Sequence, residues 1–318
     1  MKKVLITGVA GFIGSNLARH CLNEGWIVEG VDDLSNGHQE FVPDGVVFYQ
    51  DDFASNGILN RIKKGRYDSV FHLAAVPRVS YSVEYPLKTN DVNVSRTLSL
   101  MDACRDNINR FVFASSSSVY GGADILPTVT SSSKYPKSPY ALQKSMIEDY
   151  LLLYNSLYGL ESVALRFFNV FGPHQLGDSP YATAVSAWLD AAKRGTSLRS
   201  DGDGTQTRDM CYVDNVASAC VLASKTEGPL NARPLNVACG SRVSNNEILE
   251  KVLEEFPAAE VVNAPWRPGD VMHTLADINE TKQAIGYEVL VDFWEGLQLT
   301  IDWFNDNWDT IKSMELNT

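Results

Sequence analysis

Tyr140 and Lys144 are the two residues of this sequence whose types and spacing best suit acid–base chemistry. They lie four positions apart in Ser138-Pro-Tyr-Ala-Leu-Gln-Lys144, and on a helix this spacing places both side chains on one face. A free tyrosine has a pKa of about 10, and a nearby ammonium lowers the pKa of the phenol toward the neutral range. We therefore expect Tyr140, together with the serine run 115–118, to take a proton from an alcohol.

The N-terminal segment predicts a dinucleotide site. Gly8, Gly11 and Gly14 follow a first predicted strand and open a helix, where backbone N–H groups and the helix dipole can hold a pyrophosphate. Asp32 ends the second predicted strand, roughly 20 residues later, where its carboxylate can accept hydrogen bonds from ribose hydroxyls. That carboxylate would repel a 2′-phosphate, so the pattern favours NAD over NADP. Each feature alone is also typical of a tight turn or a solvated acid.

Residues at the ends of later strands extend the same crevice. Asp52 and Phe53 follow the third predicted strand and can bracket an adenine, and small residues in Leu73-Ala74-Ala75 let a cofactor approach the backbone. Asn93 lies in the next predicted helix. Each is more often structural when it occurs alone, but together they trace one crevice over the carboxyl ends of the strands.

Periodicity predicts an α/β fold. Short, nearly continuous apolar runs at 3–7, 27–31, 46–49, 69–73, 110–114 and 162–166 indicate buried parallel strands. They alternate with amphipathic segments near 12–24, 54–63, 86–106 and 138–158. We expect a Rossmann-type, doubly wound parallel sheet at 1–170 that binds NAD. Loop signals then separate helical stretches near 181–194, 244–256 and 292–309, so we expect a smaller, interleaved substrate-binding lobe at 171–318.

Composition excludes several classes of function. The 318 residues carry a net charge of −12, which argues against broad attraction to nucleic acid or to an anionic membrane. No apolar stretch approaches membrane-spanning length. Five cysteines lack Cys-x-x-Cys spacing and five histidines are scattered, so we expect free thiols in a reducing cytoplasm and no metal site.

Seven motifs, in order, resemble those of the extended short-chain dehydrogenase/reductase family, and the whole chain resembles its nucleotide-sugar 4-epimerases. The motifs are Thr7-Gly-Val-Ala-Gly-Phe-Ile-Gly14, His72-Leu-Ala-Ala75, Ser115-Ser-Ser-Ser-Val-Tyr-Gly121, Ser138-Pro-Tyr-Ala-Leu-Gln-Lys144, Leu165-Arg-Phe-Phe-Asn-Val-Phe-Gly-Pro173, Gly202-Asp-Gly-Thr-Gln-Thr-Arg-Asp209 and Arg267-Pro-Gly-Asp270. The resemblance implies that Tyr140 is the base, that Lys144 lowers its pKa and holds the nicotinamide ribose, and that Ser116 hydrogen-bonds the reacting hydroxyl.

The resemblance also implies the ligand contacts. Its NAD positions are Gly8, Gly11, Phe12, Ile13, Gly14, Asp32, Asp33, Asn36, Gly37, Asp52, Phe53, Leu73, Ala74, Ala75, Asn93, Ser115, Tyr140, Lys144 and Phe168. Its UDP-sugar positions are Arg78, Ser80, Ser117, Ser118, Asn169, Thr183, Arg208, Arg267, Asp270 and Thr274. For each arginine taken alone, a surface or interlobe ion pair is the commoner role.

Two positions bear on the reaction and on the sugar. The related 4,6-dehydratases carry an Asp-Glu pair directly after the Ser/Thr, but this chain has Ser117 and Ser118 there, so the resemblance implies reversible oxidation at C4. Thr274 stands where relatives restricted to plain hexoses tend to have tyrosine. A smaller residue implies that UDP-GlcNAc and UDP-GalNAc are accepted alongside UDP-Glc and UDP-Gal, unless Thr274 only packs between the lobes.

Other functions remain possible interpretations of the sequence. One is a UDP-glucuronate 4-epimerase, although such enzymes typically have threonine where this chain has Asn169. The others are a nucleotide-sugar reductase or dehydratase and a non-catalytic NAD-binding regulator. The helices near 86–106 and 138–158 resemble those that pair into an intersubunit four-helix bundle, so a homodimer is expected. Supply of surface-polysaccharide precursors would suit the activity.

Overall fold

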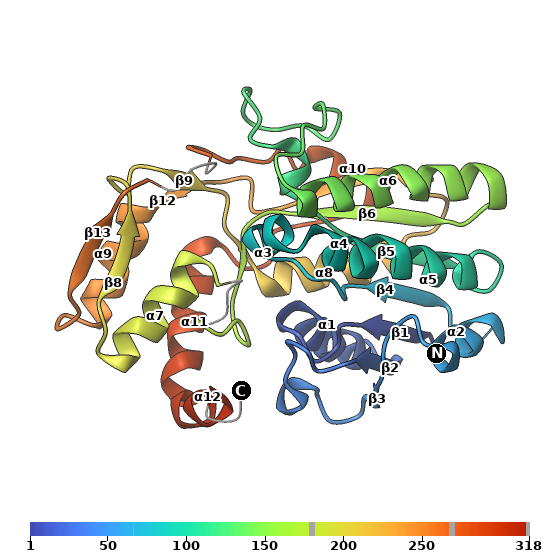
Figure 1. Ribbon diagram of the computed structural model, residues 1–318, viewed down its shortest axis with the longest axis horizontal. Helices are drawn as coiled ribbons and strands as arrows, with labels where there is room; N and C mark the ends of the chain where they lie inside the picture. Colours follow the sequence, from blue (N-terminus) through green and yellow to red (C-terminus); the bar gives the residue numbers. More distant parts are fainter. Residues whose placement is uncertain (66, 178–181, 267–270, 316–318) are drawn as a thin grey trace.

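A parallel sheet of seven strands forms the centre of the molecule (Figure 1). The computed structural model describes residues 1–65, 67–177, 182–266 and 271–315. Its strand order is β11-β6-β5-β4-β1-β2-β3, with every neighbouring pair parallel. The strands are β1 (Lys3–Thr7), β2 (Ile27–Asp32), β3 (Val47–Gln50), β4 (Ser69–His72), β5 (Arg110–Ser116), β6 (Ser162–Phe167) and β11 (Pro234–Val237). The order reverses between β1 and β4, which is where a ligand crevice forms in such sheets.

Helices cover both faces of the sheet. One face packs against α1 (Phe12–Asn23) and α8 (Val213–Lys225), and the other against α2 (Asn56–Lys63), α5 (Thr97–Cys104) and α6 (Pro139–Tyr158). Successive strand residues point to opposite faces, so Val4 and Ile6 join the first core and Leu5 the second. Burial on both faces explains the unbroken apolar runs. The predicted Rossmann-type architecture is confirmed.

A second helical run lies between β4 and β5. It consists of α3 (Val79–Glu84), α4 (Pro86–Asn90), the π-helical segment η2 (Asp91–Arg96) and α5. The predicted helix at 86–106 is therefore present, but with wider turns at its centre. Segments of this kind are often found at functional sites, and η2 carries Asn93.

Helix α6 begins at a defined point, which matters because Tyr140 lies in its first turn. The Ser138 hydroxyl accepts the N–H of Ala141 at 3.1 Å, and Pro139 occupies the first helical position. Both are strong helix-start signals. The helix ends at Gly159, whose φ is 70°, as is common after a last helical turn. Lys144 consequently lies one turn beyond Tyr140.

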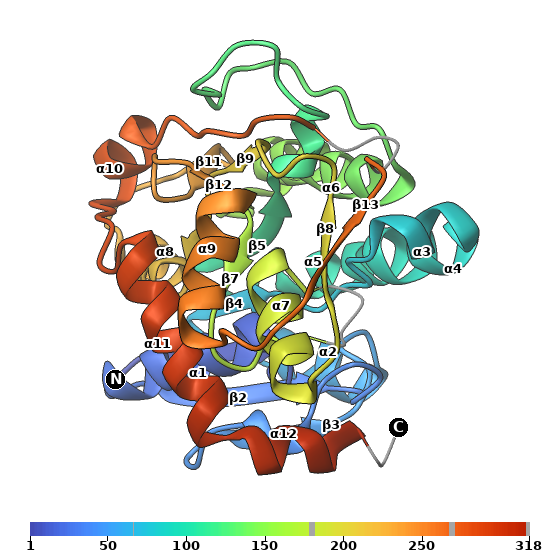
Figure 2. The same cartoon turned by 90° about the vertical axis from the view of Figure 1, so that its left-hand side faces the viewer.

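The C-terminal half builds a third core, beside the sheet (Figures 1 and 2). Trp188, Ile248 and Leu297 are among its buried side chains. Its elements are β7 (Val170–Phe171), α7 (Ala184–Arg194), β8 (Leu198–Asp201), β9 (Thr207–Arg208), β10 (Cys211–Tyr212), β12 (Val243–Ser244), α9 (Asn245–Glu255), β13 (Val261–Ala264), α11 (Phe293–Asp306) and α12 (Trp308–Glu315). Helix α10 (Asn279–Ile285) packs instead on the first core, against α8 and β11. The remaining short turns are the 3-10 helices η1 (Gln39–Phe41) and η3 (Ser117–Tyr120).

The chain returns to the first core from its C-terminal half. Helix α8 packs on α1, and β11 pairs with β6. Neither element is predicted from the sequence, because α8 is buried over most of its surface and so lacks a polar stripe of helical period. No helix of the described residues is long and apolar enough to cross a membrane.

Candidate active site

The structure brings Ser116 and Tyr140 together at the carboxyl end of β5. The Ser116 hydroxyl lies beside the Tyr140 phenol and favours its phenolate form. Ser116 also caps η3 by accepting the N–H of Ser118 at 3.2 Å. The Tyr140 backbone N–H donates to the buried Ser82 hydroxyl at 3.1 Å, so α3 fixes the start of α6. The Ser82 hydroxyl is therefore engaged with the backbone that carries the phenol.

Lys144 lies beneath Tyr140 in a buried position. Its ammonium donates to the Ala114 carbonyl at 2.7 Å and lies 5.9 Å from the centre of the Tyr140 ring. Burial lowers the pKa of Lys144 to about 7, and the nearby Glu148 carboxylate opposes this shift. The two predicted partners therefore share one cleft, as their spacing required.

The predicted lowering of the phenol pKa is wrong for the chain alone. Burial raises the pKa of Tyr140 to about 12, and only the nearby Ser116 hydroxyl acts in the opposite direction. The reason is that burial disfavours the charged form of both groups, the phenolate as well as the ammonium. Lys144 also directs its ammonium to Ala114. The chain by itself thus holds Tyr140 as a neutral phenol.

The other serines of the run 115–118 differ in their contacts. The Ser118 hydroxyl is buried and has no hydrogen-bond partner within the described parts of the chain, so it is suited to bind a ligand. Ser117 is half-buried in η3. The Ser115 hydroxyl instead donates to the Glu148 carboxylate at 2.6 Å. Ser115 therefore faces the protein, and its predicted contact with the cofactor stays a prediction.

The glycine loop fits a pyrophosphate. Gly8 has a φ of 74°, and a Cβ there would lie 2.8 Å from the backbone nitrogen of Ala74. A Cβ on Gly14 would lie 2.0 Å from the Gly8 carbonyl oxygen. Gly11 precedes α1, whose N-terminus has neither a side-chain cap nor an acidic residue in its first turn. The first turn, which begins with Phe12 and Ile13, therefore offers its dipole and N–H groups to an anion.

Asp32 ties this loop to the end of β2. One carboxylate oxygen accepts the N–H of Ala10 at 3.0 Å and the other accepts that of Leu34 at 2.9 Å. Burial raises the pKa of Asp32, and these N–H groups oppose the shift. Each carboxylate oxygen has a second lone pair, so the arrangement fits a ribose diol. Gly37 keeps this space open, because a Cβ there would lie 3.0 Å from Asp32 Oδ1.

Two further predicted positions lie in the exposed loop after β2. Asp33 accepts the N–H of Ser35 at 2.9 Å, and the Asn36 amide lies 3.4 Å from the Ser35 hydroxyl. Both are exposed at the rim beside Asp32. Their contacts with the cofactor stay predictions.

The predicted crevice walls are held largely by the protein itself. Asp52 accepts the N–H of Ala54 at 2.7 Å and pairs with Arg96, while Phe53 packs against His72 with ring centres 4.9 Å apart.

The segment after β4 is fixed in the same way. Thr7 accepts the N–H groups of Leu73 and Ala74, each at 3.2 Å, and Ala75 follows in the same half-buried segment. Asn93 uses both ends of its amide: its oxygen accepts the N–H of Val76, and its nitrogen donates to Val76 and Gln143. Asn93 thus positions this segment, and its direct contact with the cofactor stays a prediction. Phe168 is buried directly after β6.

The predicted substrate positions lie on several separate segments of the chain. Arg78 and Ser80 hydrogen-bond each other at 2.9 Å on the exposed segment around the start of α3. Asn169 is half-buried after β6, and its carbonyl accepts the N–H of Cys211. The Thr183 hydroxyl donates to Gln175 at 2.9 Å. Arg267 and Asp270 lie outside the described residues.

Arg208 and Thr274 lie on adjacent backbone segments. Arg208 donates to the carbonyls of Thr207 and Met272 at 3.0 and 3.2 Å. Thr274 donates its N–H to the Thr207 carbonyl, and its hydroxyl accepts the N–H of Asp209 at 3.0 Å. The position expected to select the sugar is therefore bonded to Asp209, the residue that follows Arg208.

Sequence reasoning missed the buried carboxylates that support this site. Asp209 accepts backbone N–H groups from Cys239, Gly240 and Ala276, and burial raises its pKa to about 7. Glu148 lies four residues after Lys144 on α6 and is paired with Arg166. Glu148 could have been found from the sequence, because it follows Lys144 at the same four-residue spacing that separates Lys144 from Tyr140.

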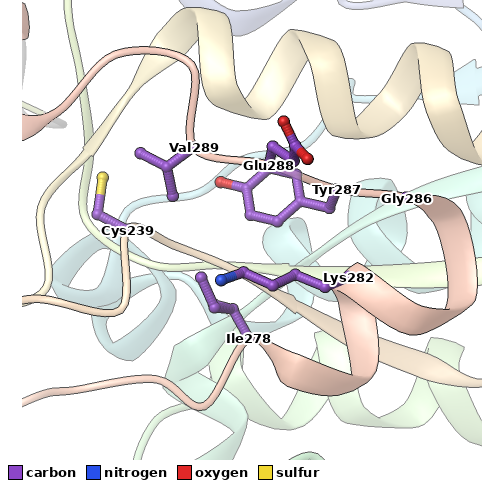
Figure 3. Close-up of a pocket in the computed structure, with 7 residues that line it drawn as sticks. All are labelled: Cys239, Ile278, Lys282, Gly286, Tyr287, Glu288 and Val289. Carbon is purple, nitrogen blue, oxygen red and sulfur yellow. The ribbon is translucent and has the colours of Figure 1, made fainter.

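A cavity of about 430 Å³ lies between α10, the segment that follows α10, and Cys239 (Figure 3). It is lined by Cys239, Ile278, Lys282, Gly286, Tyr287, Glu288 and Val289, none of which is a predicted site residue. Within the described ranges there is no cluster of three His, Cys, Asp or Glu side chains that could hold a metal ion.

Comparison with known proteins agrees with this geometry. Residues 4–238 match the NAD dependent epimerase/dehydratase family. The UDP-glucuronate 4-epimerase of Thermodesulfobacterium geofontis is 32% identical over 330 residues, covering 98% of this chain and 99% of that protein.

Two solved structures are also similar over nearly their whole length. The UDP-N-acetylglucosamine 4-epimerase of Methanobrevibacter ruminantium, in complex with UDP-N-acetylmuramic acid, has a TM-score of 0.90 at 35% identity and covers 96% of this chain and 99% of its own. The UDP-glucose 4-epimerase of Thermus thermophilus, in complex with NAD, has a TM-score of 0.86 at 34% identity and covers 95% of this chain and 99% of its own. The chain belongs to the NAD dependent epimerase/dehydratase family, within its group of nucleotide-sugar 4-epimerases, and its cofactor is NAD.

Proposed function

We propose that this enzyme inverts C4 of UDP-N-acetylhexosamines, interconverting UDP-GlcNAc and UDP-GalNAc, and that it also accepts UDP-Glc and UDP-Gal. The observation that carries the proposal is the position of the Ser116 hydroxyl beside the Tyr140 phenol, at the carboxyl end of β5. The two positions after Ser116 are serines. A carboxylic acid and carboxylate for the elimination of water are therefore missing from these positions.

The proposed mechanism assigns the proton to Tyr140. NAD held by the glycine loop and Asp32 would supply reversible hydride transfer at C4 of the sugar. Tyr140 takes the O4 proton as the sugar becomes a 4-keto sugar, and gives a proton back after the sugar has turned over in the pocket. Ser116 hydrogen-bonds O4 and holds it against the phenol. The Lys144 ammonium favours the phenolate by its charge, within about 6 Å of the ring.

The proposed choice of sugar depends on Thr274. Its side chain is small and half-buried, and its hydroxyl is fixed by the Asp209 N–H. A fixed, small side chain leaves space for an acetamido group at C2. The name of the Methanobrevibacter enzyme, at 35% identity, supports the same choice.

A UDP-glucuronate 4-epimerase is the second candidate. The Thermodesulfobacterium relative carries that name at 32% identity. A carboxylate at C6 would require a positive charge nearby. Arg78 is a predicted sugar contact whose side chain carries such a charge. Arg78 is exposed and hydrogen-bonded to Ser80, which favours the neutral sugars.

Parallel incubations separate these candidates. Purified enzyme is given UDP-GlcNAc, UDP-Glc or UDP-GlcA, and initial rates are measured by NMR of the products. We expect UDP-GalNAc from the first and UDP-Gal from the second. Conversion of UDP-GlcA alone would show that the enzyme is a UDP-glucuronate 4-epimerase. A dehydrated product would show that it is a dehydratase, and either result would contradict this proposal.

We further propose that the enzyme works as a cytoplasmic homodimer and supplies precursors of a surface polysaccharide. Support for the dimer comes from α6 and α4, where Leu142, Leu152, Leu153, Leu157 and Leu87 are exposed. Clustered apolar side chains of this kind mark interfaces. A second copy docking the same helices would bury them in a four-helix bundle. Leu153→Asp with Leu157→Asp should give a monomer in sedimentation, whereas Leu290→Asp, at an exposed leucine elsewhere, should not.

A further inference from the structure

Lys144 needs help to remain an ammonium ion in its buried position. Its side chain is almost wholly shielded from water, and burial lowers its pKa to about 7. The titratable groups facing it are Tyr140 and Glu148 on α6 and His72 on β4. Burial and the Lys144 charge lower the pKa of His72 to about 3, so His72 is neutral. Of these three groups, Glu148 carries the negative charge that favours the ammonium.

Glu148 is held in one orientation by three charge-assisted hydrogen bonds. Arg166, on β6, donates Nε to one carboxylate oxygen at 2.9 Å and Nη2 to the other at 2.7 Å. Ser115 donates to the first oxygen at 2.6 Å. Glu148 and Arg166 are both about 3% exposed. Lys134 lies farther away, 3.8 Å from Glu148 on its outer side.

The same contacts reach the reacting end of β5. Ser115 directly precedes Ser116, and Ala114, which accepts the Lys144 ammonium, directly precedes Ser115. Arg166 in turn donates to the Tyr120 hydroxyl at 2.8 Å and to the Thr130 carbonyl at 2.9 Å. Glu148 thus joins α6 to the strand end that carries both Ser116 and the Lys144 acceptor. A buried ion pair is costly to desolvate and is weak evidence for stability alone.

We propose that Glu148 is a positioning residue of this site, which keeps the Lys144 ammonium charged and, through Ser115, holds Ser116 against Tyr140. The consequence for the reaction rests on the proposed function of Tyr140 and Ser116. The effect on Lys144 does not, because the charge of Lys144 can be measured without turnover.

The direct test is an NMR titration of lysine side chains labelled with carbon-13 at Cε. The Lys144 signal is identified by its loss in Lys144→Arg. In Glu148→Gln, we expect the midpoint of the Lys144 titration to fall by about one pH unit or more, because one unit is the lower end of the effect of a close opposite charge. Asp149→Asn is the matched control. Asp149 is the next residue on α6, pairs with Lys134 and has a side chain that is 64% exposed, so its removal should leave the midpoint in place.

Measurements of kcat and KM test whether Glu148, through Ser115, positions Ser116. Ser115→Ala should lower kcat about tenfold, since it removes one charge-assisted hydrogen bond, with little change in KM and with the Lys144 midpoint unmoved. Glu148→Gln should lower kcat and also move the alkaline limb of the rate profile to lower pH. If the enzyme turns over none of the UDP-sugars, the proposed function fails while the titration still decides the role of Glu148.

Folding is controlled separately, because Glu148→Gln leaves the Arg166 cation buried without its partner. The double variant Glu148→Gln/Arg166→Met removes both charges of the pair and should show a lowered Lys144 midpoint as well. An unchanged midpoint in either folded variant would overturn the proposal. Failure of both to fold, beside a folded Asp149→Asn, would assign Glu148 to folding and would overturn it too.

Discussion

The Ser116 hydroxyl lies beside the Tyr140 phenol, where the end of β5 meets the start of α6. The two residues are 24 positions apart in the sequence. The Ser82 hydroxyl fixes Tyr140 from the other side by accepting its backbone N–H. The proposed proton acceptor therefore lies beside the group that would orient the alcohol.

Removal of the phenol should stop the reaction without preventing binding. We expect Tyr140→Phe to lower kcat by roughly 10²–10⁴-fold, the usual contribution of a positioned acid–base group, and to leave the affinity for UDP nearly unchanged in calorimetry. Tyr135→Phe is the control, because Tyr135 is 69% exposed and lies outside the site. Normal turnover by Tyr140→Phe would remove Tyr140 from its role.

The titration of Tyr140 should depend on the cofactor. Burial raises the pKa of Tyr140 to about 12 in the chain alone. The oxidised nicotinamide carries a positive charge, which favours the phenolate over the neutral phenol and therefore lowers this pKa. We expect the step in phenolate absorbance that is lost in Tyr140→Phe to occur near pH 12 without NAD and at lower pH with NAD bound. An equal midpoint in both states would contradict the proposed activation.

Asp32 should control the choice between NAD and NADP. Asp32→Asn keeps a group that can accept one hydrogen bond but removes the charge, so we expect NAD affinity to fall about tenfold or more and discrimination against NADP to weaken. Fluorescence titration with each dinucleotide measures both effects. Asp44→Asn, at an exposed acid in the next loop, should change neither affinity. Retained discrimination in Asp32→Asn would place the specificity elsewhere.

The Thr274 hydroxyl complicates any test of the sugar pocket by size alone. Replacing Thr274 by tyrosine adds bulk but also removes the hydrogen bond from the Asp209 N–H. Thr274→Val removes that bond at nearly constant volume and is the matched control. We expect Thr274→Tyr to suppress UDP-GlcNAc far more than UDP-Glc in kcat/KM, and Thr274→Val to affect both alike. Equal losses on both sugars in Thr274→Tyr would argue against a steric gate.

The sequence predicts the sheet and the reacting pair well, because both depend on local patterns. The first six strands appear as apolar runs, and the Tyr140–Lys144 spacing places both residues in one cleft. Helix α8 and strand β11 were missed, since a segment buried on all sides has no diagnostic period.

Charge states in the site could not be predicted from spacing. The pKa values of Tyr140 and Lys144 depend on how deeply each group is buried, and burial is set by elements far away in the chain. The same is true of Asp209, whose three backbone partners come from the segments around 239 and 276. No local pattern around Asp209 signals that arrangement.

The most direct test of the central claim follows the hydrogen at C4. UDP-GlcNAc carrying deuterium at C4 is incubated with the enzyme in ordinary water, and the product is examined by NMR and mass spectrometry. Oxidation and return of the same hydride predict UDP-GalNAc that keeps deuterium at C4, with no net accumulation of NADH. Loss of the deuterium to solvent, release of water from the sugar, or lasting NADH would contradict epimerisation through a 4-keto sugar.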